Sequence, residues 1–167
     1  ITKATAQLMR DFGCVQSPIN AYMLNLGLES LHVRMARHCE NGQAVAEFLA
    51  SHPEIAYVNY CGLPGDKYHA VAETYLPNGS CGVVSFGVKG GREAAAAFMG
   101  HLKIAAIETH VADARTCGLH PASSTHRQMN DEQLIAAGVQ PDLVRMSCGL
   151  EDKNDLIHDI AQALDQI

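Results

Sequence analysis

The sequence of 167 residues predicts an α+β domain in which helices cover one face of a mostly antiparallel sheet. Apolar residues recur at helical spacing in residues 18–51 and 153–167, and short β-branched or aromatic runs lie between these stretches. The expected order is long helix, strand, helix, strand, helix, strand, loop, strand, helix, which favours the α+β class. No repeat or linker divides the chain, so residues 1–167 are expected to form one domain.

The first expected element is a long helix. Ser17 suits the N-cap position and Pro18 the first helical position. Apolar residues continue at helical spacing, so we expect the helix to end before Pro53, with an interruption near residues 41–42. Its polar side chains are expected to form a solvated face.

The middle of the chain is expected to hold three strands. Residues 55–60, 81–88 and 104–109 are short apolar runs bounded by turn-forming residues. Between the first two strands, Asp66 is expected to cap a short helix that ends at Leu76.

Two glycines, Gly90 and Gly91, join the second strand to a helix expected over residues 92–99. Backbone N–H groups at such a junction can cradle a phosphate. The junction has neither a GxGxxG nor a Walker pattern, so a plain tight turn is favoured.

Helical and strand periodicity both disappear between His110 and Gln128. A long polar loop inside a compact domain is uncommon and often functional. His126 in this loop is a candidate general base and Cys117 a candidate nucleophile, but a hydrogen-bonding loop residue and a packed thiol are the favoured interpretations.

The C-terminal part is expected to contain two helices around a strand. Asn130 or Asp131 is expected to cap a brief helix that ends at Gly138. The strand at residues 143–147 follows, and Asp152 is expected to cap the last helix. That helix carries an apolar stripe, formed by Leu156, Ile157, Ile160, Leu164 and Ile167.

Arg145 lies inside this last apolar strand. A guanidinium there is costly to bury unless an anion meets it, and its planar fork suits a carboxylate held by two parallel hydrogen bonds. A small acidic substrate would supply such a carboxylate. From this segment alone, a salt bridge to one of the chain's own carboxylates is the favoured alternative.

Charge and composition exclude several classes of function. The formal net charge is −6 and basic residues do not cluster, which argues against a nucleic-acid surface. No apolar run is long enough for a membrane helix, and the first residues do not resemble a signal peptide. The chain does not begin with Met, so we expect it to be a segment of a longer protein.

The six cysteines are widely spaced and form no CxxC pair, so buried reduced thiols of a cytoplasmic protein are favoured over disulfides. The nine histidines include no HxxxH or HExxH spacing. We therefore expect no metal site.

Several motifs together resemble the C-terminal domain of the PLP-dependent enzymes of Cys/Met metabolism. The opening carries Ser17-Pro18-Ile19-Asn20-Ala21, and the middle carries Gly62-Leu63-Pro64 and Val88-Lys89-Gly90-Gly91. The most specific matches are His120-Pro121-Ala122-Ser123-Ser124-Thr125-His126 and Arg145-Met146-Ser147-Cys148-Gly149-Leu150-Glu151. The resemblance covers the chain from about Leu8 to its end.

This resemblance implies the small C-terminal domain of a fold-type I, aminotransferase-like enzyme, which binds an amino-acid substrate. Arg145 matches the family's arginine for the substrate α-carboxylate, and Thr125 matches a residue near the substrate. His110 stands where relatives have Asn or Ser, at a backbone that helps to hold the carboxylate. Ala112 replaces a common Gly and Thr116 a Ser, so the chain departs from the family beside His110.

The resemblance also implies what this chain lacks. The family's Ser-x-Thr-Lys motif, which supplies the Schiff-base lysine, is absent, as are the phosphate-binding loop and the aspartate for the pyridinium nitrogen. We therefore expect no catalytic residue in this chain, no tight binding of PLP by it alone, and an N-terminal PLP domain as its missing partner. Relatives form tetramers, so a homo-oligomer is expected.

The His-Pro-Ala-Ser form of the loop is most similar to the branch of the family that converts O-acetylhomoserine and sulfide to homocysteine. The branches of cystathionine or methionine γ-lyases and γ-synthases are the alternative enzymes. A binding or oligomerisation module without catalysis is the alternative outside the enzymes.

Overall fold

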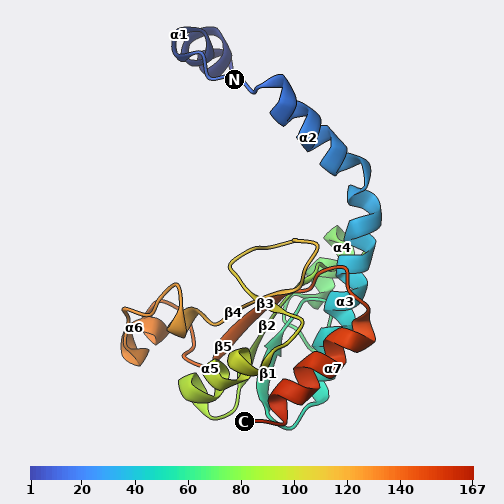
Figure 1. The fold of residues 1–167 in the computed structure, drawn as a ribbon, viewed down its shortest axis with the longest axis vertical. Helices are drawn as coiled ribbons and strands as arrows, with labels where there is room; N and C mark the ends of the chain where they lie inside the picture. Colours follow the sequence, from blue (N-terminus) through green and yellow to red (C-terminus); the bar gives the residue numbers. More distant parts are fainter. The chain divides into compact units, whose positions relative to one another are not determined.

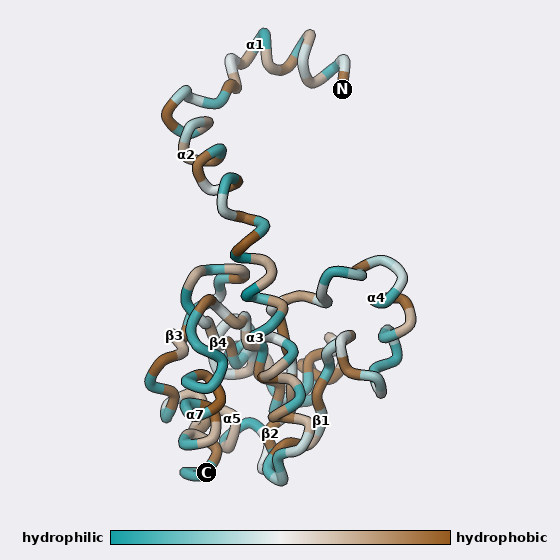
Figure 2. Tube along the Cα trace, turned by 90° about the vertical axis from the view of Figure 1, so that its right-hand side faces the viewer, coloured by the Kyte–Doolittle hydropathy of each residue, from teal (hydrophilic) through white to brown (hydrophobic).

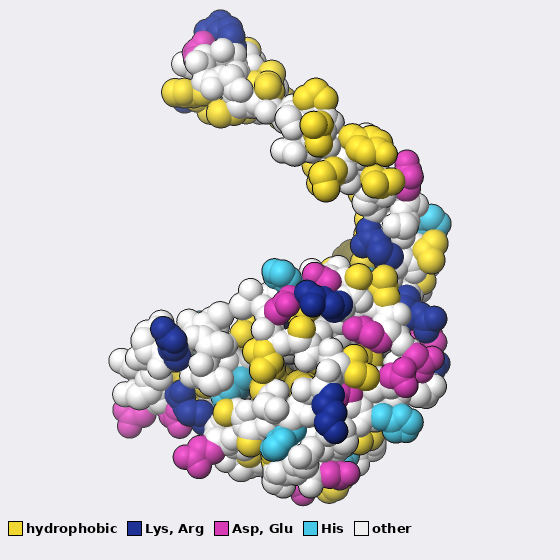
Figure 3. Space-filling model, viewed as in Figure 1, with side chains coloured by type: hydrophobic (Ala, Val, Ile, Leu, Met, Phe, Trp, Pro, Cys, Tyr) yellow, Lys and Arg dark blue, Asp and Glu magenta, His cyan; other side chains and the backbone are white.

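The computed structural model describes residues 1–167, which divide into two compact units, Ile1–Val33 and Arg34–Ile167. The first unit contains a π-helical segment η1 (Ala4–Met9) continued by α1 (Arg10–Phe12), and then α2 (Pro18–Glu29). The side chain of Ser17 accepts a hydrogen bond from the N–H of Asn20 at 3.2 Å, which confirms Ser17 as the N-cap. Figure 3 shows many apolar side chains on the surface of α2, including those of Ile19, Tyr22, Met23, Leu24, Leu26 and Leu28.

The expected long helix is divided at Ser30, where α2 ends and α3 (Leu31–Ser51) begins. The expected interruption near residues 41–42 is wrong, because α3 continues through both. Gly42 has a packing role instead: a Cβ atom there would lie 2.5 Å from the carbonyl oxygen of Cys81. The glycine lets α3 pass close to the backbone before β2.

The second unit is built on a five-stranded sheet in the order β1-β2-β5-β4-β3 (Figure 1). Its strands are β1 (Ile55–Asn59), β2 (Val83–Val88), β3 (Ala106–Ile107), β4 (Cys117–Leu119) and β5 (Leu143–Ser147). The pairs β1–β2, β2–β5 and β4–β5 are antiparallel and β3–β4 is parallel, so the sheet is mostly antiparallel, as predicted.

Two predictions about the strands need correction. The strand expected over residues 104–109 is only two residues long, and β4 lies inside the segment expected to be a loop. Both strands are short and depend on pairing with other strands of the sheet, which local periodicity does not reveal.

The remaining helices are α4 (His69–Tyr75), α5 (Gly91–His101), η2 (Pro121–Ser123, a 3₁₀ turn), α6 (Asp131–Ala136) and α7 (Lys153–Leu164). Asn130 caps α6 in a capping box with Gln133, and Asp152 caps α7 through the N–H of Asn154. Asp66 does not cap α4 as expected; the N-cap residue is Tyr68, whose N–H donates to the Asp66 carboxylate at 2.8 Å. Gly90 and Gly91 have φ of 97° and 76° and form the tight turn into α5.

The hydrophobic core lies between one face of the sheet and helices α3, α5 and α7. Val84 and Phe86 of β2 and Val144 and Met146 of β5 are fully buried in it. Figure 2 shows hydrophobic stretches, in brown, along β1 and β2. Because side chains alternate along a strand, the neighbouring residues of β2 and β5 point to the opposite face. That opposite face is where Arg145 lies.

A buried carboxylate of α7 holds the chain just before β3. Asp159 is 4% exposed and accepts hydrogen bonds from three consecutive backbone N–H groups, those of Lys103, Ile104 and Ala105, at 2.8, 2.9 and 3.1 Å. These N–H groups precede the two-residue strand and have this side chain as their acceptor. The last helix therefore fixes the edge of the sheet.

All six cysteines are free thiols, but the expectation that they are buried holds for only two of them. Only Cys117 and Cys148 are fully buried, and Cys14 is exposed. None of the helices combines the length and the hydropathy that crossing a bilayer requires.

Candidate functional site

A cavity of about 480 Å³ lies on the sheet face opposite the helices. It is formed by strand residues of β2, β4 and β5 together with the segments that precede β4 and follow it. Its walls are mostly apolar in area, although five of its nine lining residues carry polar side chains. The lining residues are Val83, Ser85, Thr109, Leu119, Pro121, Thr125, His126, Leu143 and Arg145. Two of the three predicted substrate-binding residues, Arg145 and Thr125, therefore share one cavity.

Arg145 sits in the middle of β5, opposite Ser85 of β2 and Leu119 of β4. Its Nη2 donates to the carbonyl oxygen of Thr109 at 2.8 Å, and its buried Nε has no hydrogen-bond partner. None of the ion pairs in the structure includes Arg145, so the alternative of a salt bridge within the chain is not what the structure shows. The cation lines a cavity and no carboxylate of this chain neutralises it.

The donors of Arg145 can be assigned. A guanidinium has five N–H donors: one on Nε and two on each Nη. Nε is buried and one hydrogen of Nη2 is directed to Thr109. Both hydrogens of Nη1 and one of Nη2 are left for a ligand. Neighbouring Nη atoms form the fork that grips a carboxylate through two parallel bonds.

Thr125 reaches the cavity from the loop after η2. Its hydroxyl lies 2.9 Å from Nδ1 of His126, and both residues line the cavity. This pairing fits the interpretation of His126 as a hydrogen-bonding loop residue.

The Thr125 loop is held by two buried contacts at its start. His120, 2% exposed, lies 2.9 Å from the hydroxyl of Ser123 through Nδ1 and 2.8 Å from the carbonyl oxygen of Pro141 through Nε2. Burial lowers the pKa of His120, so the neutral ring, with one donor and one acceptor nitrogen, is favoured. The ring links the loop to the segment that leads into β5.

Arg92 of α5 holds the same loop from the other side. Its Nη1 donates to the carbonyl oxygen of Ala122 at 2.7 Å and its Nη2 to that of Met129 at 3.2 Å. Its Nε and Nη2 both bond one oxygen of Asp131, at 2.8 and 2.6 Å. Sequence reasoning treated Arg92 only as part of a helix and missed this role, for which no local pattern gives a signal.

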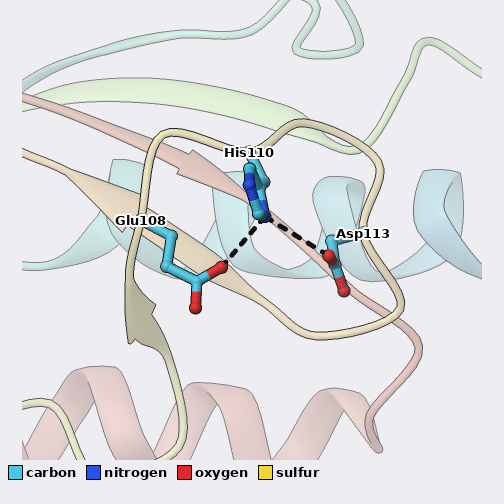
Figure 4. Close-up of side chains that lie close together, drawn as sticks. All are labelled: Glu108, His110 and Asp113. Carbon is cyan, nitrogen blue, oxygen red and sulfur yellow. Dashed lines mark ion pairs between the residues drawn. The ribbon is translucent and has the colours of Figure 1, made fainter.

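His110, the third predicted substrate-binding residue, does not line the cavity. Its side chain is 63% exposed, and Nδ1 lies 3.0 Å from Glu108 and 3.5 Å from Asp113 (Figure 4). The residue before it, Thr109, contributes the carbonyl oxygen that bonds Arg145. The residue that lies at the cavity is thus Thr109, through its backbone carbonyl, whereas the side chain of His110 lies outside the cavity.

Glu108, His110 and Asp113 each place one potential metal ligand within 4.8 Å of the others. The group is largely exposed, and Arg115 already lies 3.1 Å from Glu108. A cation at this position would have to compete with the guanidinium. The geometry is that of a surface charge cluster.

Cys117 fits the interpretation of a packed thiol. It is 1% exposed, and burial together with the nearby Glu108 carboxylate raises its pKa. Burial likewise raises the pKa of Cys148 to about 12. Since the thiolate is the nucleophilic form, neither environment activates its cysteine.

Two further residues that line the cavity, Ser85 and Leu119, were not singled out from the sequence. Ser85 is a polar residue between Val84 and Phe86, and Leu119 precedes the His120 motif. Strand alternation places Ser85 on the face opposite the core, but locating it beside Arg145 requires the β2–β5 register. That register was not available from periodicity.

The chain matches the family described as Cys/Met metabolism PLP-dependent enzyme over residues 1–165. It is 44% identical over its whole length to O-acetyl-L-homoserine sulfhydrylase of Leptospira meyeri, of which it covers 38%. It is 42% identical, over 98% of its length, to O-acetyl-L-homoserine sulfhydrylase 1 of Thermus thermophilus, of which it covers 39%. It is also 42% identical, over 95% of its length, to homocysteine synthase of Schizosaccharomyces pombe, of which it covers 37%.

Solved structures agree with the sequence relatives. The chain superposes on a crystal structure of a putative O-acetylhomoserine (thiol)-lyase from Campylobacter jejuni with a TM-score of 0.87. The identity is 36%, and the match covers 98% of this chain and 39% of that one, which carries N'-pyridoxyl-lysine-5'-monophosphate at position 205. The chain thus spans less than two fifths of the length of these relatives. These matches confirm the resemblance and the fold-type I architecture, and the chain belongs to the PLP-dependent enzymes of Cys/Met metabolism.

Proposed function

We propose that the full-length protein containing this chain is a PLP-dependent O-acetylhomoserine sulfhydrylase of methionine and cysteine biosynthesis. It converts O-acetylhomoserine and sulfide to homocysteine and acetate. The observation that carries the proposal is the guanidinium of Arg145, which lines a cavity without a carboxylate partner from its own chain. The names of the relatives in Leptospira, Thermus and Schizosaccharomyces support this substrate and product.

In this proposal Arg145 binds the α-carboxylate of the amino-acid substrate. The free hydrogens of Nη1 and Nη2 grip both carboxylate oxygens and thereby fix the plane of the carboxylate. Fixing that plane orients the bonds at the neighbouring Cα, which lowers the entropic part of the barrier. Thr125 lines the same cavity and positions the substrate from the side of the loop. The backbone at Thr109 and His110 borders the carboxylate.

PLP, when bound, supplies the electron sink for reactions at the amino acid. The residues of this chain fit the substrate of such a reaction better than the cofactor: the cavity offers one guanidinium, the imidazole of His126 and three hydroxyls, and no lysine lines it. We therefore assign the cofactor-binding lysine, the phosphate site and the catalytic groups to the rest of the protein. The isolated chain is expected to be inactive and to bind PLP weakly.

The proposed partners are the N-terminal PLP domain and further copies of the enzyme in a homo-oligomer. The exposed apolar side chains of α2 support a covering partner, since large exposed apolar surfaces commonly mark interfaces. We further propose a cytoplasmic location, which the six free thiols support.

Activity of the purified full-length enzyme tests the proposal. O-acetylhomoserine plus sulfide should yield homocysteine and acetate in a 1:1 ratio, and cystathionine or methionine should be turned over far more slowly. Faster turnover of cystathionine or methionine would instead assign the protein to the γ-lyases or γ-synthases. No turnover of any of the three would favour a binding or oligomerisation module.

A further inference from the structure

The orientation of Arg145 depends on a loop that joins β3 to β4. The buried Nε of Arg145 has no partner, and the hydrogen bond from Nη2 to the Thr109 carbonyl is what holds the guanidinium within the chain. Thr109 belongs to the loop of residues 108–116 between β3 and β4. A shift of this loop would therefore move the Thr109 carbonyl oxygen that orients the guanidinium of Arg145.

Glu151 and Thr116 attach the end of this loop to the backbone that follows β5. The N–H of Thr116 donates to Oε1 of Glu151 at 2.7 Å, and the Thr116 hydroxyl donates to Oε2 at 2.8 Å. The same hydroxyl accepts a hydrogen bond from the N–H of Gly149 at 2.8 Å. Thr116 is fully buried, so these bonds are shielded from water.

The packing at Gly149 is close enough to define the position of the loop. A Cβ atom on Gly149 would lie 2.5 Å from the Ala114 carbonyl oxygen and from the Arg115 carbonyl carbon. The N–H of Leu150 also donates to the Ala114 carbonyl at 2.9 Å. The loop thus lies directly against the backbone four to five residues after Arg145.

A second attachment lies on the strand of Arg145 itself. The N–H of Ala112 donates to the hydroxyl of Ser147, 2% exposed, at 3.0 Å. Ala112 has a φ of 58°, in the left-handed region that residues other than glycine rarely adopt. Such a backbone conformation persists when its surroundings hold it. The Ser147 bond is a contact that does so.

We propose that Thr116, with Glu151 and Ser147, positions the carboxylate-binding fork of Arg145 through the 108–116 loop. These three residues do not line the Arg145 cavity, and they act on it through Thr109. The inference rests on the proposed function, because its measure is the binding of the substrate carboxylate. Substitution of these residues should change the KM for the amino-acid substrate and leave the KM for sulfide unchanged.

Thr116→Val in the full-length holoenzyme tests this role. Valine keeps the shape, loses both hydroxyl bonds and leaves the buried N–H of Gly149 without an acceptor. We expect the KM for O-acetylhomoserine to rise roughly tenfold, with the KM for sulfide within about twofold of wild type. Thr116→Ser restores the hydroxyl and should restore the KM. Thr74→Val, which removes an exposed helix-surface hydroxyl from a bond to Ala70, is the matched control and should change neither KM.

Ser147→Ala provides a second variant in case Thr116→Val does not fold. It should raise the same KM by severalfold, with unchanged PLP content. The inference is overturned if both variants retain the wild-type KM for O-acetylhomoserine. It is equally overturned if they raise the KM for sulfide as much, because a general loss of structure would then explain both. A wild-type enzyme without sulfhydrylase activity would refute the proposed function, whereas an active wild type with insensitive variants refutes only the positioning role.

Discussion

Replacement of Arg145 is the most direct test of the carboxylate site. The structure leaves two adjacent Nη donors for a ligand, and a hydrogen bond to a charged group contributes about 1.5–3 kcal/mol. Removing one partner of a buried charge pair costs on the order of 2–5 kcal/mol. For Arg145→Ala in the full-length enzyme we therefore expect kcat/KM for O-acetylhomoserine to fall roughly 30-fold to 4,000-fold.

Arg145→Lys separates charge from geometry. Lysine keeps the positive charge but cannot present two parallel donors, so about one charge-assisted hydrogen bond is lost. We expect kcat/KM to fall roughly 10-fold to 100-fold, less than for alanine. The assay is the initial rate of homocysteine formation at saturating sulfide, and Arg37→Ala is the control because Arg37 forms a surface ion pair with Glu40. An Arg145→Ala enzyme with wild-type kcat/KM would refute the assignment, and equal losses for alanine and lysine would refute the two-donor grip.

Three further predictions concern the scaffold of the site. Arg92→Ala removes two hydrogen bonds to the backbone of the loop that carries Thr125 and two to Asp131 at the start of α6. The variant should have a higher KM for O-acetylhomoserine and should be cut faster by proteases within residues 120–131. An unchanged digestion pattern would contradict this role. Burial lowers the pKa of His120, so below about pH 6.5 the unfolded chain binds more protons than the folded chain. The midpoint of urea unfolding should therefore fall as the pH drops below that value, and His120→Gln should weaken this pH dependence. Gly42→Ala should lower the melting temperature, because the new Cβ would lie 2.5 Å from the carbonyl oxygen of Cys81. Gly100→Ala, which has open space around it, should stabilise the fold by up to about 1 kcal/mol. Equal changes in melting temperature for the two variants would contradict the packing argument.

The elements that local chemistry defines were predictable from the sequence. Ser17, Asn130 and Asp152 were expected at helix starts, Asn130 as one of two candidates, and each side chain accepts a backbone N–H in the structure. The central strands β2 and β5 were also predicted, because continuous apolar runs identify strands that are buried on at least one face. These signals lie within a few residues of the features that they predict.

Features that depend on distant residues were not predictable in this way. The strands β3 and β4 have only two and three residues, and their pairing joins segments separated by a loop. Gly42 suggested a break in the helix, yet it is required by the backbone near Cys81, far along the chain. A glycine that ends a helix and a glycine that admits a close neighbour look alike in one sequence.

The residues of the candidate site also divide into those with a local sequence signal and those that depend on distant residues. Arg145 was identified as a cation inside an apolar strand and Thr125 through the family motif that contains it, and the structure places both on one cavity. Arg92 was not identified, because the three acceptors of its four hydrogen bonds lie on residues 30 or more positions away. The role of Thr109 was also missed, since it is played by a carbonyl group that every residue possesses.

The carboxylate of Asp159 sets a lower limit on how far the C-terminus can be trimmed. A deletion that removes residues 159–167 would leave the amides of residues 103–105 without their acceptor and would expose the apolar side of α5. Each stranded amide costs about 1–3 kcal/mol, and a small domain has only about 5–15 kcal/mol in reserve. The last turns of α7 therefore hold the outer strand β3 next to β4, and a shortened chain would lose that strand before it lost any residue that lines the Arg145 cavity.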